Sequence, residues 1–453
     1  MAETASALGG GYAYRTSGGA VPQRRERGFD PSIILLIVAC MVLPRLFSVE
    51  LAGVRFTPLR FVLLLVAIPA VVQFLSKRRL MLFDALYLAF ALWTVLCILY
   101  NRGLAGGLQF GGQFFLETGI LYIACQAYLV RASQITTLVN LLFWLTFGLL
   151  ILAVIENTAD SHIFLRFFQR MVGAPETLHA IGDRRLGMIR ATTIFSHPII
   201  SGLFCSSTFA LLWYLQRNVA MRIFQSLVVI LATFLSLSSG PILALMFQMG
   251  AVGTEMTTRW LPNRFRYIAA GVGAILAAFH FFTARGLFTI VAWMVLNPAS
   301  AYYRKHLWNN ATDDIWRSPI LGMRPENWTR PAWMSPSVDN YWLVQAMQGG
   351  LPSIVFIFAA MGVLAYKVFS FRSPHLPDAL QGLRRGWAYT TLAMALCAAT
   401  VHFFHQAQPL FALIIALGGV IYRLLESWER EAGPDGGAAE ASAPVQPPRR
   451  TLL

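Results

Sequence analysis

Hydrophobic runs of near-bilayer length alternate with short polar turns along most of the chain. Twelve such runs can be read from the sequence, at 32–49, 56–76, 80–100, 108–130, 134–156, 198–216, 223–239, 241–258, 267–283, 341–369, 386–402 and 409–422. A helix needs about 20 apolar residues to cross the hydrocarbon core of a membrane. The pattern therefore predicts an all-α, polytopic membrane protein with about twelve transmembrane helices.

Lysine and arginine gather in alternate turns, of which the triplet at 77–79 is the plainest. Cytoplasmic turns of membrane proteins carry such an excess of positive charge. This rule places both termini in the cytoplasm and two long loops, 157–197 and 284–340, on the outer side. No cleavable signal is evident in residues 1–30. Residues 1–30 and 430–453 are both rich in Gly, Ala and other small or turn-forming residues, so we expect them to be disordered cytoplasmic tails. The membrane domain is then expected at 31–429.

The composition agrees with a membrane protein and excludes an ordinary soluble domain. Of the 453 residues 57% are apolar and only 13% are charged, and the mean hydropathy is +0.58. The net charge of +15 lies mostly at the ends of hydrophobic runs, which favours lipid headgroups and gives no indication of nucleic-acid binding. The five cysteines all fall in apolar runs and have no disulfide or metal spacing.

The first long loop ends in a polar segment that leads directly into the sixth hydrophobic run. It reads Arg190-Ala-Thr-Thr-Ile-Phe-Ser-His197-Pro198, and Arg185 lies shortly before it. Proline suits the first turn of a helix, and a helix N-terminus attracts anions, so His197 and these arginines are candidates for binding an anionic ligand. The alternative is structural, with Ser196 capping the helix and His197 at the membrane interface.

The second long loop is rich in Arg, Trp and Pro and ends at Asp339-Asn340. Asp339 is a candidate general base at the mouth of the following helix, although either residue is also suited to cap that helix. The run that follows contains Gly349, Gly350 and Pro352, which predicts a bend or break near its outer end. Further candidates for binding an anion in this loop are Arg304, Arg317 and Arg324.

His402 and His405 lie three residues apart in the turn before the last run. Two histidines on one helical face can bind a metal, but no carboxylate or cysteine accompanies them locally. A cavity wall or a contact with an acceptor substrate is therefore the favoured interpretation, and no metal site is predicted.

Four segments of the chain resemble the O-antigen ligase and polysaccharide polymerase family of bacterial envelope enzymes. They are Arg190 to Pro198, the stretch from Ser236 to Gly240, the Ser318-Pro319 to Gly322 stretch, and Asp339-Asn340 with the trailing Gly350. Ligases of this family usually carry His where this chain has Asp339, which favours a polymerase. The family's motif is Ser-x-Ser-Arg-Gly, and this chain has Ser239 at the position of the Arg. One expected phosphate contact is therefore missing.

The resemblance implies a metal-independent, inverting glycosyl transfer on the extracytoplasmic side of the bacterial cytoplasmic (inner) membrane, without a cofactor. The donor would be an oligosaccharide on undecaprenyl pyrophosphate, and the lipid bilayer and other polysaccharide-export proteins are the expected partners. Asp339 or His197 would take the acceptor's proton, and arginines of both loops would hold the pyrophosphate: Arg190, Arg324, Arg317, Arg304 and Arg185. Sugar or cavity contacts would come from Asn340, Trp342, His402 and His405.

Two other functions remain open from the sequence. An O-antigen ligase would transfer the same glycan to a lipid or protein acceptor. A flippase for lipid-linked oligosaccharides would also have about twelve helices, but transporters concentrate polar groups near mid-membrane. The ionisable residues inside the runs are few, and Arg60, Glu117 and Glu255 are the plainest.

Overall fold

A computed structural model describes residues 32–51, 54–173, 184–258, 260, 298–371 and 376–432. These residues are mostly helical, with two short antiparallel strand pairs. Six helical segments are long and apolar enough to cross a membrane: Pro58–Lys77, Leu82–Tyr128, Ala132–Thr158, Pro198–Leu215, Tyr341–Ser370 and Ala407–Glu431. The protein is thus an all-α, multi-pass membrane protein. The expected span at 267–283 and most of both expected tails lie outside the described residues.

The N-terminal half contains the helices α1 to α6. Their bounds are α1 Ser32–Val42, α2 Pro58–Lys77, α3 Leu82–Phe115, the π-helix η1 Leu116–Ile120, α4 Leu121–Tyr128, α5 Ala132–Thr158 and α6 Ile163–Val172. The strands β1 (Val49–Leu51) and β2 (Val54–Phe56) pair between α1 and α2. Thr57 caps α2 by accepting a hydrogen bond from the amide of Arg60, and Pro58 occupies the first turn.

The long helix α3 is a hairpin of two antiparallel arms. The chain reverses at Gly103, where φ is 69° and ψ is 179°, a conformation that is almost restricted to glycine. Beyond the turn, Gly107 lies against Leu99 and Gly111 against Val95, so the arms pack closely. The break agrees with the two separate runs expected at 80–100 and 108–130.

The central segment, 184–258, begins with the strand pair β3 (Arg184–Arg185) and β4 (Met188–Ile189). It continues with α7 Pro198–Ser206, α8 Phe209–Leu215, α9 Val219–Leu235 and α10 Ser239–Thr257. After the undescribed segment come α13 Pro298–Arg317, the 3-10 turn η3 Pro325–Asn327, α14 Tyr341–Ser370, α15 Asp378–Ala398 and α16 Ala407–Ala432. The helix α13 was not expected from the sequence, which gave an irregular loop there.

The predicted break in the run at 341–369 is a complete reversal at Gly350, where φ is 66° and ψ is −177°. Trp342 and Phe358 stack with ring centroids 4.6 Å apart, whereas one continuous helix would separate them by about 24 Å. The arm 341–349 therefore runs antiparallel to the arm 351–370, and Asn340 lies about 15 Å along the bundle from the tip at Gly350. The expected single span is wrong in this respect.

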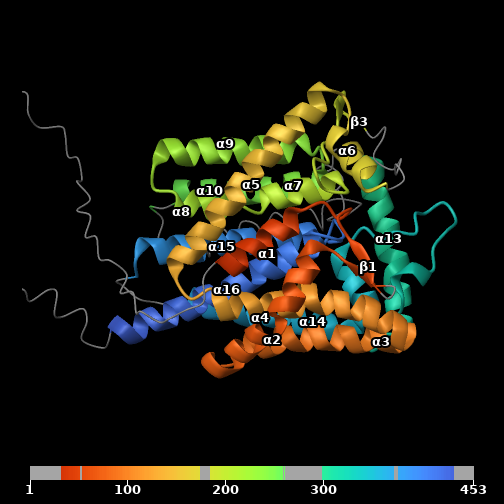
Figure 1. The fold of residues 1–453 in the computed structure, drawn as a ribbon, viewed down its shortest axis with the longest axis horizontal. Coiled ribbons are helices and arrows are strands. Elements are labelled where there is room, and N and C mark those ends of the chain that lie inside the picture. Colours follow the sequence, from red (N-terminus) through yellow and green to blue (C-terminus); the bar gives the residue numbers. More distant parts are fainter. Residues whose placement is uncertain are drawn as a thin grey trace, which may run out of the picture.

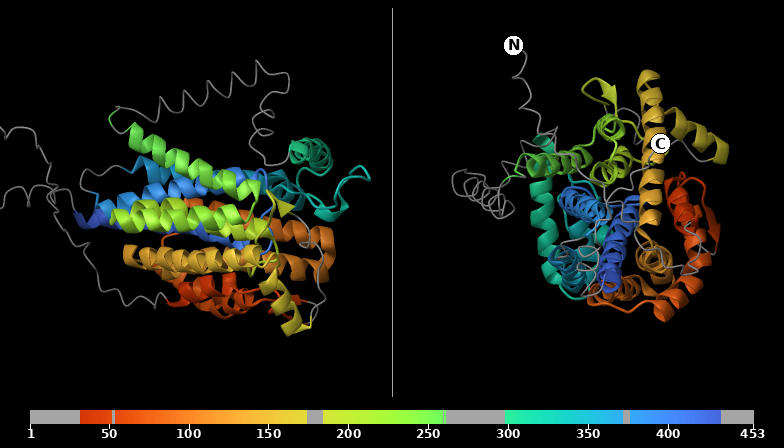
Figure 2. Two further views of the ribbon diagram at one scale, coloured as in Figure 1. Left: turned by 90° about the horizontal axis from the view of Figure 1, so that it is seen from above. Right: turned by 90° about the vertical axis from the view of Figure 1, so that its left-hand side faces the viewer.

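The helices form one bundle, and α6, α13 and the short strands gather at one end of it. α3 packs on α14, α8 on α15 and α5 on α9, while α4 lies between α2 and α16. α6, α13 and both strand pairs lie together at the right-hand end in Figure 1, and the side view in Figure 2 agrees. We call this the loop end. Every candidate residue named from the sequence belongs to a segment at or near it.

Candidate functional site

Two arginines of the first loop reach the same turn at the start of α10. The β3–β4 pair turns through Leu186 and Gly187, both with positive φ, a geometry that suits the twist of a two-residue hairpin. Arg185 donates to the carbonyl of Leu237 at 3.0 Å, and Arg190, only 7% exposed, donates to Ser238 Oγ at 2.9 Å. Positive charge is thereby concentrated beside the N-terminus of α10.

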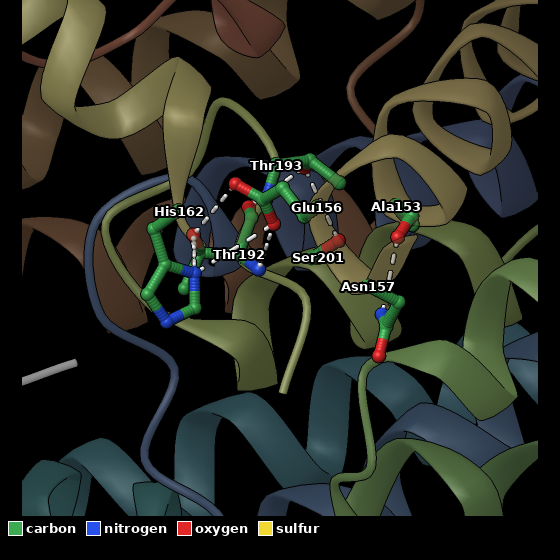
Figure 3. A network of polar contacts seen from close by, with 7 residues as sticks. All are labelled: Ala153, Glu156, Asn157, His162, Thr192, Thr193 and Ser201. Atoms are coloured by element: carbon green, nitrogen blue, oxygen red, sulfur yellow. Dashed lines mark hydrogen bonds and ion pairs between the residues drawn. The ribbon is translucent and has the colours of Figure 1, made fainter. Parts of the chain in front are cut away.

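A buried carboxylate at the end of α5 holds the segment that follows Arg190. Glu156 Oε2 accepts the backbone amides of Thr192 at 3.0 Å and Thr193 at 2.9 Å, and His162 Nδ1 lies 3.7 Å away (Figure 3). Thr193 has a positive φ of 56°, which is unusual for a β-branched residue. Glu156 therefore fixes the turn that positions Arg190. This role could not be predicted from the sequence, in which Glu156 is only the last residue of an apolar run.

His197, expected to lie beside a capping Ser196, is itself the cap of α7. Its Nδ1 accepts the amide of Ile199 at 3.1 Å, and Pro198 occupies the first helical position. In the neutral ring the proton then resides on Nε2, which cannot accept another. His197 is accordingly placed less well than a carboxylate to act as a base.

Asp339 and Arg304 lie near enough to interact electrostatically but do not form an ion pair. Arg304, on α13, interacts electrostatically with Asp339 and Arg185, yet in the described part of the chain no nitrogen–oxygen contact of 4.0 Å or less joins it to Asp339. Its buried Nη1 has no hydrogen-bond partner among the described residues. Desolvation lowers the pKa of Arg304. Desolvation by the surrounding protein also raises the pKa of Asp339, although the residue is exposed at its surface. The hydrogen bond from Ser337 and the charge of Arg304 oppose that rise.

Asn340, not Asp339, caps the helix that follows. Its Oδ1 accepts the amide of Leu343 at 3.0 Å, and its Nδ2 donates to the carbonyl of Ala399 at 2.6 Å. Asn340 is 1% exposed, so it is a structural residue and not an open sugar contact. Asp339 accepts one hydrogen bond, from Ser337 Oγ at 3.3 Å, and the residue is exposed.

The start of α10 and the end of α15 meet next to these charges. A Cβ added to Gly240 would lie 2.4 Å from Val401 and 3.3 Å from Cys397, so the two helix ends are in close contact. Arg304 lies near the thiol of Cys397, at the end of α15. The loop end thus brings together Arg185, Arg190, Arg304 and Asp339 from three separate segments, and we call these four residues the basic cluster.

Arg317 and Arg324, the other expected anion ligands, bind different parts of the loop end. Arg317 donates to Asp314 at 2.9 Å and to Thr329 Oγ1 at 3.1 Å, which ties α13 to the loop behind it. Arg324 donates to the carbonyl of Asn101 at 2.8 Å, at the tip of the α3 hairpin. Both arginines make structural contacts, and neither shares a hydrogen-bond partner with the basic cluster.

Trp342 lies in the core and offers no face to a sugar, which corrects the expectation from the sequence. It is 8% exposed, stacks on Phe358 and donates its indole N–H to the carbonyl of Ala395 at 3.0 Å. His402 and His405 are partly buried in the turn before α16, and burial lowers the pKa of His402 to about 4. Within the described residues no group of three or more His, Cys, Asp or Glu side chains could hold a metal ion.

No protein-family model matches the chain, and neither does any curated protein. A function can therefore be inferred only from the arrangement of these residues.

Proposed function

We propose that this protein polymerises oligosaccharide repeat units carried on undecaprenyl pyrophosphate, as an inverting glycosyltransferase of the O-antigen ligase and polysaccharide polymerase family. The observation that carries the proposal is the basic cluster, in which Asp339 lies near Arg304 without pairing while Arg185 and Arg190 converge on the start of α10. A carboxylate beside several cations suits a reaction that moves one proton and releases one anion.

In this reaction the acceptor sugar's hydroxyl oxygen attacks the anomeric carbon of the donor. The bond from that carbon to the pyrophosphate oxygen breaks, and the pyrophosphate lipid leaves with the electron pair. Asp339 takes the hydroxyl proton, and attack opposite the leaving group inverts the anomeric configuration. Arg185, Arg190, Arg304 and the N-terminus of α10 stabilise the charge that develops on the pyrophosphate.

The contacts of the basic cluster also bear on the two departures from the family's pattern. Where the family carries Arg, this chain has Ser239, but Arg185 and Arg190 both bind the residues just before it, so positive charge is supplied to the same turn. Asp339 is favoured over His197 as the base because the Nδ1 of His197 is already used to cap α7.

The proposal includes about twelve membrane spans, cytoplasmic termini and a site on the extracytoplasmic side of the inner membrane. The reversal at Gly103 supports counting two spans in the apolar stretch from Leu82 to Tyr128. The gathering of α6, α13 and the short strands at one end supports a site on one side of the bilayer.

A flippase is the alternative of another class, and the ionisable residues inside the bundle argue against it. Arg60 pairs with Glu117 at 2.6 Å, and Glu255 pairs with Arg385 at 3.1 Å. Both pairs are internally neutralised, and in each pair one member, Arg60 or Glu255, lies in the first or last turn of its helix.

The test is to incubate the purified protein with lipid-linked repeat units alone and to separate the products by chain length. Polymerisation needs no second acceptor, so a ladder of longer glycans is expected from the parental protein and none from Asp339→Asn. Product that appears only when a lipid or protein acceptor is added would identify a ligase. Movement of lipid-linked glycan across vesicles without any new glycosidic bond would identify a flippase.

A further inference from the structure

A polar pocket separate from the basic cluster lies at the loop end, between α1, α2, η1 and the turn before α16. It encloses about 320 Å³, counted to its open mouth, and its polar lining includes Arg45, Arg60, Glu117, His405 and Gln406. No member of the basic cluster lines it. We call it the Arg45 pocket.

The two arginines of the Arg45 pocket differ in their partners. Arg60 donates to Glu117 at 2.6 Å and to the carbonyl of Arg55 at 2.7 Å, so its charge is neutralised and its position fixed. Arg45 makes no hydrogen bond and no ion pair within the described residues. Two guanidinium groups against one carboxylate leave the pocket with an excess of positive charge, and Arg45 carries it.

The excess charge persists at neutral pH. Burial, reinforced by Arg60, lowers the pKa of Arg45 to about 10, which still leaves the guanidinium protonated. Burial, followed by the charges of Arg45 and Arg60, holds the pKa of His405 well below its usual range, so this ring is neutral. A partly desolvated cation without an anion is costly, and an anionic ligand removes that cost.

Two irregularities in the backbone aim side chains at this pocket. Glu117 lies in the π-helical turn Leu116–Ile120, and single π-turns of this kind occur frequently at functional sites. His405 has a positive φ of 53°, which costs free energy for a residue other than glycine. In the described part of the chain, His405 Nδ1 and the Oε1 atom of Gln406, a residue 8% exposed, are buried without hydrogen-bond partners. The pocket thus has unused polar groups besides Arg45.

We propose that the Arg45 pocket binds one phosphate group of an anionic ligand, with Arg45 as its charge partner. The identity of that ligand rests on the proposed function: polymerisation joins two lipid-linked chains, and the basic cluster accounts for only one of the two pyrophosphates. The second, acceptor chain would then place its phosphate here. The turn at 402–405 also contacts the segment that follows Arg190, since Phe404 packs edge to face on His197 with ring centroids 5.6 Å apart.

The test measures binding of farnesyl pyrophosphate to the full-length protein in detergent, without turnover. Arg190→Ala is used as the background because it weakens the basic cluster, so the remaining binding reports the Arg45 pocket. Adding Arg45→Gln should weaken that binding about tenfold or more, because a charge-assisted contact is lost. Arg55→Gln is the matched control, since Arg55 lies nearby on β2 but does not line the pocket.

Without the probe, Arg45→Gln should melt at the parental temperature or above it, because the change removes an unpaired, partly buried charge. Arg45→Lys keeps the charge and should retain part of the binding. Equal affinity of the Arg190→Ala protein with and without Arg45→Gln would overturn the proposal. A loss of affinity equal to that of Arg55→Gln would do so as well.

Competition by two further probes identifies the source of the phosphate. Displacement by phosphatidylglycerol at equal affinity would keep the phosphate site but assign it to bilayer headgroups, which would overturn the acceptor's role. Displacement only by pyrophosphate-bearing compounds supports that role. A protein that binds farnesyl pyrophosphate here yet forms no polymer would refute the proposed function and leave the phosphate site standing.

Discussion

Asp339→Asn is the substitution that tests the proposed chemistry most directly, because it removes a charge and a proton acceptor while keeping the side chain's shape. The helix cap is unaffected, since Asn340 provides it. The one hydrogen bond lost or altered is the contact of 3.3 Å from Ser337 Oγ. We therefore expect the free energy of unfolding to change by no more than about 0.5 kcal/mol, as for most accessible positions.

The expected catalytic loss is far larger. General-base assistance contributes about a hundredfold to ten-thousandfold, which corresponds to about 2.7–5.4 kcal/mol in the activation free energy. The acceptor still binds and the arginines still hold the pyrophosphate, so turnover should fall while donor affinity stays near the parental value. The separation of kcat from donor affinity distinguishes a base from a residue that only positions the donor.

The assay compares rates of chain extension by purified parental and variant proteins at saturating lipid-linked donor, with thermal unfolding as a check on the fold. Asp313→Asn is the matched control, because Asp313 is an exposed carboxylate of the same loop. Turnover of Asp339→Asn at the parental rate would refute the reasoning and direct attention to His197. Asp339→His should retain partial activity, since the resembling ligases carry His there.

The pH dependence follows from the same residue. Because the pKa of Asp339 is raised, its ionised, active form is lost at a higher pH than for an ordinary aspartate, and the acid limb of kcat/KM should shift upward. For stability, a raised pKa in the folded state means that protonation favours folding. The contribution is present at low pH and is lost as the pH rises through that pKa. At neutral pH Asp339→Asn should therefore not be less stable than the parental protein on this account.

Three further predictions concern the supports of the site. Arg190→Ala should reduce the amount of polymer at least tenfold, because it removes a charge-assisted contact. Arg190→Lys should restore little polymer, because an ammonium group cannot make the two parallel hydrogen bonds of a guanidinium group. Gly350→Ala should lower the folded yield or the melting temperature sharply, since its φ of 66° excludes a side chain and a Cβ would lie 2.1 Å from the carbonyl oxygen of Ile320. Glu156→Ala should destabilise the protein by about 2 kcal/mol or more, because the amides of Thr192 and Thr193 lose their acceptor.

Each of these has its own control and refutation. Near-normal polymer from well-expressed Arg190→Ala would remove that residue from the site. Gly362→Ala, in the same helix with open space around the added Cβ, should melt at or slightly above the parental temperature, and equal behaviour of the two glycine variants would contradict the strain argument. An unchanged melting temperature for Glu156→Ala would show that the Arg190 segment is held by other contacts.

The sequence predicted the helical class and most helix positions because apolar runs and basic turns are local signals. It also predicted a break near Gly350, since two glycines and a proline within two turns weaken any helix. It could not predict the complete reversal, because the close packing of Gly350 against Ile320 joins residues about thirty positions apart. The helix α13 escaped notice because its residues are too polar for a membrane run.

The site residues were predicted less evenly, because their roles depend on contacts between distant parts of the chain. Asp339 and Asn340 are equally good helix caps in sequence, and only the contact of Asn340 with Ala399 decides between them. Trp342 suits a sugar platform and a core equally well until Phe358 is found to cover its face. Arg45 was overlooked because its pocket is built from residues near positions 40, 60, 117 and 405, which no spacing rule connects.

The reversal at Gly350 also bears on how the protein is made. The nine residues at 341–349 are too few to cross a bilayer, so their arm cannot be held in place as an independent membrane helix during synthesis. Its start is tied instead to a later part of the chain, through Asn340 to Ala399 and through the amide of Tyr341 to the carbonyl of Val401 at 3.1 Å. The ribosome must therefore have delivered α15 before Asp339 can acquire its final surroundings, which makes the basic cluster one of the last parts of the protein to assemble.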